Sequence, residues 1–220
     1  MAISKGFKWE VLSKDDEYWN TPDFMIHYLN HRWKSQNFDT FLDIGCGLGR
    51  HSIYMAENGF NVYGIDYSKY VVDTVKEKAY SKGLDIKLSV GDISSLPYEN
   101  NCVDCMIAIG VLSNNDKAGI ALILKEMYRV LRDGGETYFN IISKISDMGS
   151  NQELMNGNAF YNITEDDFEW LFKDFGIISI KQVDELYNSM ESSSYCVLLK
   201  KVNKNGSFDD DKLKDSVFLL

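Results

Sequence analysis

The sequence predicts a doubly wound α/β sheet of seven strands, mostly parallel, with an antiparallel last strand. Three observations lead to this fold class. Short apolar runs alternate with longer amphipathic stretches, glycines follow the ends of those stretches, and a glycine-rich segment joins the first apolar run to the first amphipathic stretch. The length of 220 residues suits one compact domain with a sizeable core.

Five apolar runs are typical of buried strands, and they cover residues 40–44, 61–65, 86–90, 103–109 and 136–142. Amphipathic stretches predict helices over 51–58, 69–82 and 117–132, each followed by a glycine of the kind that ends helices. The alternation predicts parallel strands joined by helical crossovers. Only 12 residues separate Val90 from Val103, so that crossover is expected to be partly helical at most.

The C-terminal third predicts one further helix and two further strands. Thr164 and Asp167 resemble a capping box that opens a helix over 164–175, and residues 177–183 and 195–202 read as strands. Because only 11 residues without a helical pattern separate these two strands, the second is expected to return antiparallel. With the five strands above, the sequence therefore predicts seven strands.

The chain is expected to divide into three segments: an N-terminal helical lid over 1–39, the sheet domain over 40–202, and a tail over 203–220. Tyr18 and Trp19 are candidates to close over a ligand, although an aromatic helix face packed on the core explains them equally well. Residues 143–163, rich in Ser, Asn and Gly, are expected to overhang the carboxyl edge of the sheet, where open α/β folds bind ligands.

Composition excludes several classes of protein. The 23 basic and 33 acidic residues give a net charge of −10, which repels a phosphate backbone, and no basic run is present. No segment approaches the length of an apolar membrane span, and the start of the chain lacks a signal-peptide pattern, so a cytoplasmic protein is expected. Four scattered cysteines do not form a disulfide framework, and the C-x-x-C of Cys102 and Cys105 is better explained by packing on opposite faces of a strand.

The stretch FLDIGCGLGRH (41–51) contains the strongest local signal. Gly45, Gly47 and Gly49 follow a predicted strand and precede a predicted helix, where glycines allow a tight turn and the helix N-terminus offers unpaired amides. A glycine loop alone is weak evidence, because a turn requires glycines for steric reasons too.

Acids at three consecutive strand ends strengthen the signal. Asp66 ends the second strand, where a carboxylate can accept both hydroxyls of a ribose. Asp92 ends the third, where it can accept a hydrogen bond from the exocyclic amine of adenine while the amide of Ile93 meets a ring nitrogen. Each acid separately is also explained as a helix N-cap.

Asp43 and the spacing of the glycines distinguish two adenosine cofactors. A dinucleotide fingerprint requires glycine or alanine at the place that Arg50 occupies. A carboxylate beside a pyrophosphate costs on the order of several kcal/mol, whereas one beside an ammonium and a sulfonium gains a similar amount. The Tyr-x-x-x-Lys pattern of short-chain dehydrogenases is absent from the sequence. These features favour S-adenosylmethionine, with S-adenosylhomocysteine as product.

Four stretches resemble the class I S-adenosylmethionine-dependent methyltransferases, which have a Rossmann-like sheet, and within them the branch that acts on small molecules. These stretches are LDIGCGLGR (42–50), YGIDYS (63–68), GDISSLPYENNCVD (91–104) and LKEMYRVLRDGGETYFNI (124–141). The resemblance implies that cofactor-binding residues are Asp43, Gly45, Cys46 and Gly47 at the methionine end, Asp66 and Tyr67 at the ribose and adenine, Asp92 and Ile93 at the adenine edge, and Ile109, Gly110 and Ser113 beside the sulfonium.

The stretch after the fourth strand departs from two branches of that family. Residues 109–114 contain neither the two prolines of the enzymes that methylate bases in nucleic acid nor the two glutamates of protein arginine methyltransferases. A small-molecule methyltransferase is the leading hypothesis. A methyltransferase acting on RNA or protein, and a non-catalytic protein that binds the adenosyl cofactor, remain as alternatives.

No catalytic residue is assigned from the sequence. Candidates for a general base are His51, Asp116 and the pair Ser113 and Asn114. His27 and His31 would share a helix face, but without the glutamate of a zinc protease helix they indicate surface or packing roles and no metal.

Overall fold

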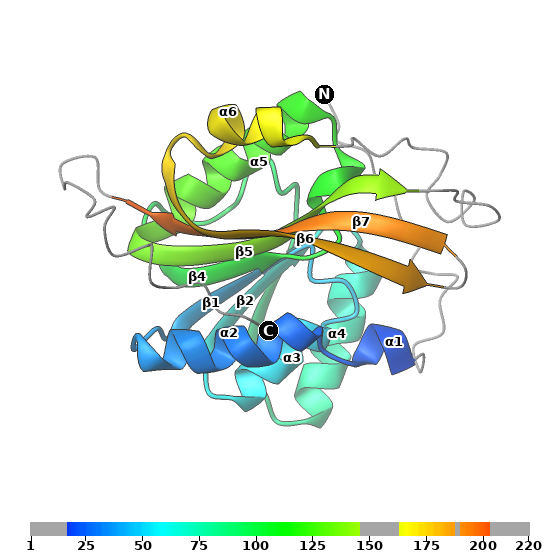
Figure 1. Ribbon diagram of the computed structural model, residues 1–220. Helices are drawn as coiled ribbons and strands as arrows, with labels where there is room; N and C mark the ends of the chain where they lie inside the picture. Colours follow the sequence, from blue (N-terminus) through cyan, green and yellow to red (C-terminus); the bar gives the residue numbers. More distant parts are fainter. Residues whose placement is uncertain (1–16, 146–162, 188–189, 203–220) are drawn as a thin grey trace.

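The computed structural model describes residues 17–145, 163–187 and 190–202, which form a seven-stranded sheet between two layers of helices (Figure 1). The strands are β1 (Thr40–Ile44), β2 (Asn61–Asp66), β3 (Ile86–Val90), β4 (Val103–Ala108), β5 (Leu131–Ile145), β6 (Phe175–Tyr187) and β7 (Met190–Lys201). The helices are α1 (Glu17–Asn20), α2 (Phe24–Ser35), α3 (Arg50–Glu57), α4 (Lys69–Ser81), α5 (Lys117–Val130) and α6 (Phe168–Phe172), with 3-10 turns η2 (Leu112–Asn114) and η4 (Glu165–Asp167).

The strand order is β3-β2-β1-β4-β5-β7-β6, and the predicted fold class is confirmed. Strands β1 to β5 pair in parallel, whereas β7 is antiparallel to both β5 and β6. The order reverses direction between β1 and β4, and the carboxyl ends of strands at such a reversal are where doubly wound sheets bind ligands.

Each face of the sheet is covered by helices whose apolar sides pack on it. In Figure 1, α2, α3 and α4 lie below the sheet, and α5 and α6 lie above it. Trp33 and Met55 pack on the lower face with Phe41 and Cys105. The upper core contains residues of α5 and α6 such as Met127. Cys102 contacts that upper core, so the predicted placement of Cys102 and Cys105 on opposite faces is correct.

Short polar side chains set the starts of the helices. Asp23 caps α2 by accepting from the amide of Met25 (2.9 Å), and Asp116 caps α5 by accepting from that of Gly119 (2.8 Å). Gly59 and Gly83 follow α3 and α4 with left-handed φ of 79° and 67°, as the sequence predicts.

Two predicted helices end earlier than predicted, and the crossover from β3 to β4 agrees with the prediction of little helix. Helix α5 ends at Val130 because Leu131 already pairs with Val103, and the pairing of β5 with β4 shifts register between Val103 and Cys105. The crossover 91–102 contains turns and no helix. The helix predicted over 164–175 consists of a 3-10 turn followed by a five-residue α-helix, because Phe175 already pairs with Lys201 in the sheet. The predicted capping box of Thr164 and Asp167 is confirmed.

Strands β5, β7 and β6 extend well beyond their neighbours at the carboxyl edge. Pairing continues to Ile145 opposite Ser192 and to Tyr187 opposite Met190. The beginning of the overhang predicted over 143–163 is therefore strand, and residues 146–162 lie outside the described residues, as does the tail 203–220. Among the described helices, none has the length and apolar character needed to cross a bilayer. A cytoplasmic location and the division into three segments stay predictions.

Candidate functional site

The loop between β1 and α3 has a backbone that only glycine adopts easily. Gly45, Gly47 and Gly49 have φ of 68°, 52° and 81°. A Cβ atom on Gly45 would lie 2.5 Å from Cγ2 of Val111, and one on Gly49 would lie 2.6 Å from Cγ1 of Val75. The loop is therefore glycine-rich for two reasons, its left-handed conformation and its close packing on the loop after β4 and on α4.

Asp43 is a buried carboxyl group near the end of β1, two residues before Gly45. Its exposed fraction is 1%, and its Oδ2 accepts a hydrogen bond from Ser52 Oγ on α3 (2.6 Å). Burial raises the pKa of Asp43 to about 6; the bond from Ser52 and the charge of Arg50 oppose this rise, and the charge of Asp66 adds to it.

Asp66 is a second buried carboxyl group, at the end of β2, with an exposed fraction of 3%. Its Oδ2 accepts from the amide of Gly47 (3.2 Å) and its Oδ1 from that of Ser68 (2.9 Å). Burial raises its pKa, and these bonds to backbone amides oppose the rise. Neither Asp43 nor Asp66 is an N-cap, because Gly49 and Ser68 hold those positions.

The predicted adenine side lies at the ends of β2 and β3. Tyr67 follows Asp66 and is exposed. Asp92 is exposed too, and its Oδ1 accepts from the amide (2.8 Å) and the hydroxyl (2.7 Å) of Ser94. Ile93 is half-buried and packs on the upper core, which leaves Asp92 facing outward.

The predicted residues after β4 are held by the carboxyl end of β5. The amide of Gly110 donates to Asn140 Oδ1 (2.7 Å), and Ser113 Oγ accepts from the amide of Ile142 (2.7 Å). Ile109 packs on the lower core. Ser113 is buried and its hydroxyl supports the backbone of β5. The sequence does not mark Asn140 as a site residue, because residues 136–142 show only the apolar pattern of a buried strand.

The side of the loop near Cys46 is covered by α1. Cys46 is buried with Leu48 and Val71, and Trp19 packs against this cluster. Burial raises the pKa of the Cys46 thiol, which keeps it protonated at neutral pH. Lys78 on α4 donates to Asn20 Oδ1 (2.6 Å) and to the carbonyl of Leu48 (3.2 Å), and so joins α1 to the loop.

Arg50 also contacts this covering segment. It donates to the carbonyl of Thr21 (3.3 Å), and its guanidinium lies 5.9 Å from the centre of the Trp19 ring. Trp19 thus packs beside the glycine loop, a position that fits both the lid hypothesis and the alternative of an aromatic side chain packed on the core. The side chain of Tyr18 lies outside the described residues.

The candidate general bases have different environments in the structure. His51 is buried at the start of α3, its Nε2 has no hydrogen-bond partner among the described residues, and burial followed by the charge of Arg50 lowers its pKa, so it is neutral. Asp116 is occupied as the cap of α5. His27 and His31 are exposed, and His27 Nδ1 lies 2.9 Å from the hydroxyl of Tyr54. No cluster suited to a metal ion occurs among the residues that the structure describes.

Comparison with known proteins identifies a family and a fold that this chain resembles. Residues 41–135 match a family described as a methyltransferase domain. Among solved structures, the chain superposes on an S-adenosylmethionine-dependent methyltransferase from Methanosarcina mazei with a TM-score of 0.66 and 22% identity, over 83% of this chain and 99% of the other. Residues 41–135 therefore belong to a methyltransferase-domain family, and the chain shares its fold with S-adenosylmethionine-dependent methyltransferases.

Other proteins are similar to this chain in sequence or in fold. It is 34% identical to the demethylmenaquinone methyltransferase of Oceanobacillus iheyensis over 48% of this chain and 45% of the relative. The PH0226 protein of Pyrococcus horikoshii shares the fold with a TM-score of 0.67 and 21% identity, over 89% of this chain and 100% of the other. Sterol 24-C-methyltransferase of Pneumocystis carinii is 27% identical over 60% of this chain and 35% of the relative. The chain therefore spans under half the length of these two curated relatives.

Proposed function

We propose that this chain binds S-adenosylmethionine across the carboxyl ends of β1, β2 and β3 and transfers its methyl group to a small-molecule acceptor. In this proposal the glycine loop and Asp43 bind the methionine end, Asp66 and Tyr67 the ribose, and Asp92 with the amide of Ile93 the adenine. The segment from Ile109 to Ser113 then borders the sulfur.

The observation that carries the proposal is the pair of buried acids under the glycine loop. Asp43 and Asp66 are both at least 97% removed from solvent, and the charge of Asp66 raises the pKa of Asp43. Two carboxylates in a region of low dielectric constant repel each other, and a ligand that brings positive charge relieves that repulsion. An anionic pyrophosphate would add to it.

The remaining groups of the site fit the parts of the cofactor. The oxygens of Asp66 accept hydrogen bonds from the amides of Gly47 and Ser68, and a carboxylate has about four acceptor positions, so Asp66 can also accept from a ribose hydroxyl. Asp92 is exposed, and its second oxygen, Oδ2, is available to accept from an amine. The amides at the start of α3 favour a carboxylate.

The bound cofactor supplies a methyl group already activated by the sulfonium. What the chain contributes is alignment and exclusion of water. Trp19 on α1 and the Gly110 to Asn140 contact border the site from two sides and define where an acceptor can approach.

A small acceptor is supported by composition and by the relatives. The net charge of −10 disfavours an RNA substrate. The names of similar proteins include demethylmenaquinone methyltransferase, sterol 24-C-methyltransferase and, for a solved structure, magnesium protoporphyrin IX methyltransferase.

Thermal unfolding with S-adenosylhomocysteine, NAD and NADP tests the choice of cofactor. A ligand that binds only the folded state stabilises it by about 2.7 kcal/mol at a hundredfold excess over its Kd. We expect stabilisation by S-adenosylhomocysteine alone. Asp66→Ala should weaken the affinity for this ligand about tenfold or more. Asp73→Ala, which changes an acid with an exposed side chain on α4, should leave that affinity unchanged. Stabilisation by a dinucleotide alone would overturn the proposal.

The class of acceptor is tested with S-adenosylmethionine that carries a radioactive methyl group. The protein is incubated separately with a small-molecule extract, with RNA and with denatured protein. We expect label in the small-molecule fraction. Transfer only to RNA or protein would contradict a small acceptor, and no transfer to any fraction despite binding would favour a non-catalytic protein.

A further inference from the structure

The crossover from β3 to β4, residues 91–102, presents Asp92 and Ile93 with little regular structure of its own. Its internal backbone bond is that of the Ser95 amide to the Asp92 carbonyl (3.1 Å), and its ends are tied by Gly91 to β2 and by Cys102 to Val130. A segment of this kind needs partners from elsewhere for its buried backbone groups. Leu96, in its middle, is 5% exposed and belongs to the upper core.

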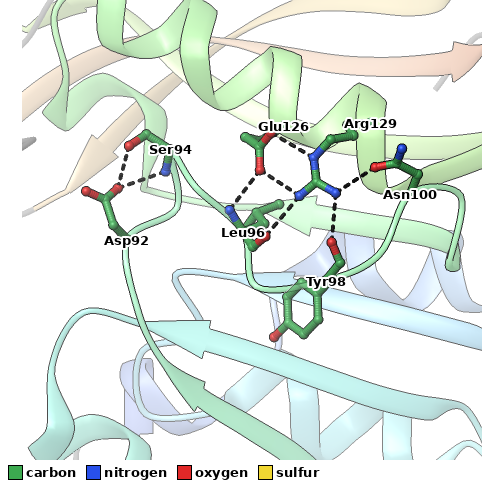
Figure 2. Close-up of polar contacts among 7 residues, drawn as sticks. All are labelled: Asp92, Ser94, Leu96, Tyr98, Asn100, Glu126 and Arg129. Carbon is green, nitrogen blue, oxygen red and sulfur yellow. Dashed lines mark hydrogen bonds and ion pairs between the residues drawn. The ribbon is translucent and has the colours of Figure 1, made fainter.

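Two side chains on one face of α5 supply those partners (Figure 2). Glu126 Oε2 accepts from the amide of Leu96 (2.9 Å), and Arg129 Nη2 donates to the carbonyl of the same residue (2.9 Å). Both backbone groups of Leu96 are therefore satisfied by α5, as a neighbouring strand would satisfy them.

Arg129 also holds the second half of the crossover. Its Nη1 donates to the carbonyl of Tyr98 (2.7 Å) and to Asn100 Oδ1 (2.9 Å). Its Nε and Nη2 donate to the two oxygens of Glu126 (2.8 and 2.7 Å), so the two charged groups fix each other's orientation. The hydrogen bond from Arg129 lowers the pKa of Glu126, which keeps it ionised as an acceptor.

Leu96, which Glu126 and Arg129 hold, is close in sequence to Asp92 and Ile93, the residues predicted to bind adenine. Asp92 accepts from the amide and hydroxyl of Ser94 and, through its carbonyl, from the amide of Ser95, so residues 92–95 form one compact turn that ends at Leu96. Figure 2 shows the turn at Asp92 and the fork of Arg129 at the two ends of this short stretch. A shift of Leu96 therefore moves Asp92 as well.

We propose that Glu126 and Arg129 are positioning residues for adenine recognition. They contact no part of the cofactor. They fix the backbone of the crossover so that the carboxylate of Asp92 and the amide of Ile93 meet the amine and ring nitrogen of the base. This inference rests on the proposed cofactor site.

Selectivity for adenine over hypoxanthine provides the readout. S-inosylhomocysteine differs from S-adenosylhomocysteine by a carbonyl oxygen in place of the exocyclic amine and by a protonated ring nitrogen. Asp92 would then face an acceptor and the Ile93 amide a donor, so both contacts are lost. We expect the wild-type protein to bind S-adenosylhomocysteine about a hundredfold more tightly. General destabilisation weakens both ligands alike and leaves this ratio unchanged.

The variants Asp92→Asn, Glu126→Gln and Arg129→Gln are compared with Arg132→Gln by calorimetric titration of both ligands. Arg132 is the matched control, because it pairs with Asp104 (2.7 Å) near the amino end of β4, away from the cofactor edge. We expect the ratio to fall about tenfold in the Glu126 and Arg129 variants, further in Asp92→Asn, and to remain at its wild-type value in Arg132→Gln. If Arg129→Gln does not fold, Arg129→Lys, which keeps the charge and loses the fork, is judged by the same ratio.

This experiment distinguishes failure of the positioning role from failure of the proposed function. A folded Glu126 or Arg129 variant with the wild-type ratio would overturn the positioning role while leaving the cofactor site intact. A wild-type protein that does not bind S-adenosylhomocysteine would overturn the proposed function itself.

Discussion

Arg32 on α2 and Glu136 on β5 form a two-pronged ion pair: Nε lies 2.8 Å from Oε2 and Nη2 lies 2.7 Å from Oε1. Glu136 is fully buried, and its Oε2 also accepts from Trp33 Nε1 (2.9 Å). One helix thus provides all three donors to a single carboxylate in the sheet. The pair anchors α2 to the lower face of the sheet. Helix α2 is followed along the chain by β1, which leads to the glycine loop.

Removal of Arg32 should destabilise the protein strongly. Arg32→Met leaves the buried charge of Glu136 with only Trp33, and we expect a loss of roughly 2–4 kcal/mol in the free energy of unfolding. The double variant Arg32→Met with Glu136→Gln should regain part of it, because no unpaired charge remains. Urea denaturation measures both, and equal stability of wild type and Arg32→Met would contradict this account.

Asp43→Asn should increase stability at neutral pH while weakening cofactor binding. Burial raises the pKa of Asp43 to about 6 from 3.8, so the folded state binds the proton more tightly than the unfolded state. Folded wild type therefore loses stability as pH rises from about 4 to about 6, and the penalty persists above pH 6. We expect Asp43→Asn to be more stable by roughly 1–3 kcal/mol at pH 7 and to match wild type near pH 4.

The ionisation of Asp43 should also make the binding of S-adenosylhomocysteine depend on pH. The ammonium of S-adenosylhomocysteine favours ionised Asp43, so its affinity for wild type should rise as pH increases through about 6. Asp43→Asn should show weaker binding and a flatter profile between about pH 5 and about pH 7.5, measured by calorimetry. An Asp43→Asn protein that keeps both the affinity and the pH profile of wild type would refute the assigned role of Asp43.

Gly45 and Gly83 form a matched pair for the requirement of glycine in the loop. Both have a left-handed backbone, with φ of 68° and 67°, but only Gly45 has a close neighbour, because a Cβ atom added there would lie 2.5 Å from Val111 Cγ2. Gly83→Ala should cost about 1 kcal/mol for its backbone conformation alone. Gly45→Ala should cost more in thermal unfolding and also reduce S-adenosylhomocysteine affinity; equal effects would mean that close packing is unimportant.

Trp19 should report cofactor binding by its fluorescence. Its ring packs on the cluster of Cys46, Leu48 and Val71 beside the proposed methionine end. Addition of S-adenosylhomocysteine should change tryptophan emission in wild type and much less in Trp19→Phe, which retains an aromatic ring. Trp170, at the far side of the sheet on α6, is the control position, and Trp170→Phe should keep the response. An unchanged response in Trp19→Phe would show that α1 does not adjoin the ligand.

Local patterns in the sequence were sufficient for the order of strands and helices and for the glycine loop. Apolar alternation, capping residues and terminal glycines act over a few residues, and parallel connectivity brings Asp43, Asp66 and Asp92 to one edge whatever the details of packing. For this reason the sequence alone predicts the fold class and the shared sheet edge at which β1, β2 and β3 end.

What the tertiary structure decided is which distant side chains satisfy buried groups. Arg32 and Glu136 are 104 residues apart, and Leu96 is 30 residues from Glu126; no local pattern pairs them. Their partners depend on how helices settle on the sheet, because a buried charge or amide must bond to whatever donor or acceptor the packing brings near. The roles of Asn140 and of the Glu126–Arg129 pair, like the burial that raises the pKa of Asp43, exist only in the folded chain.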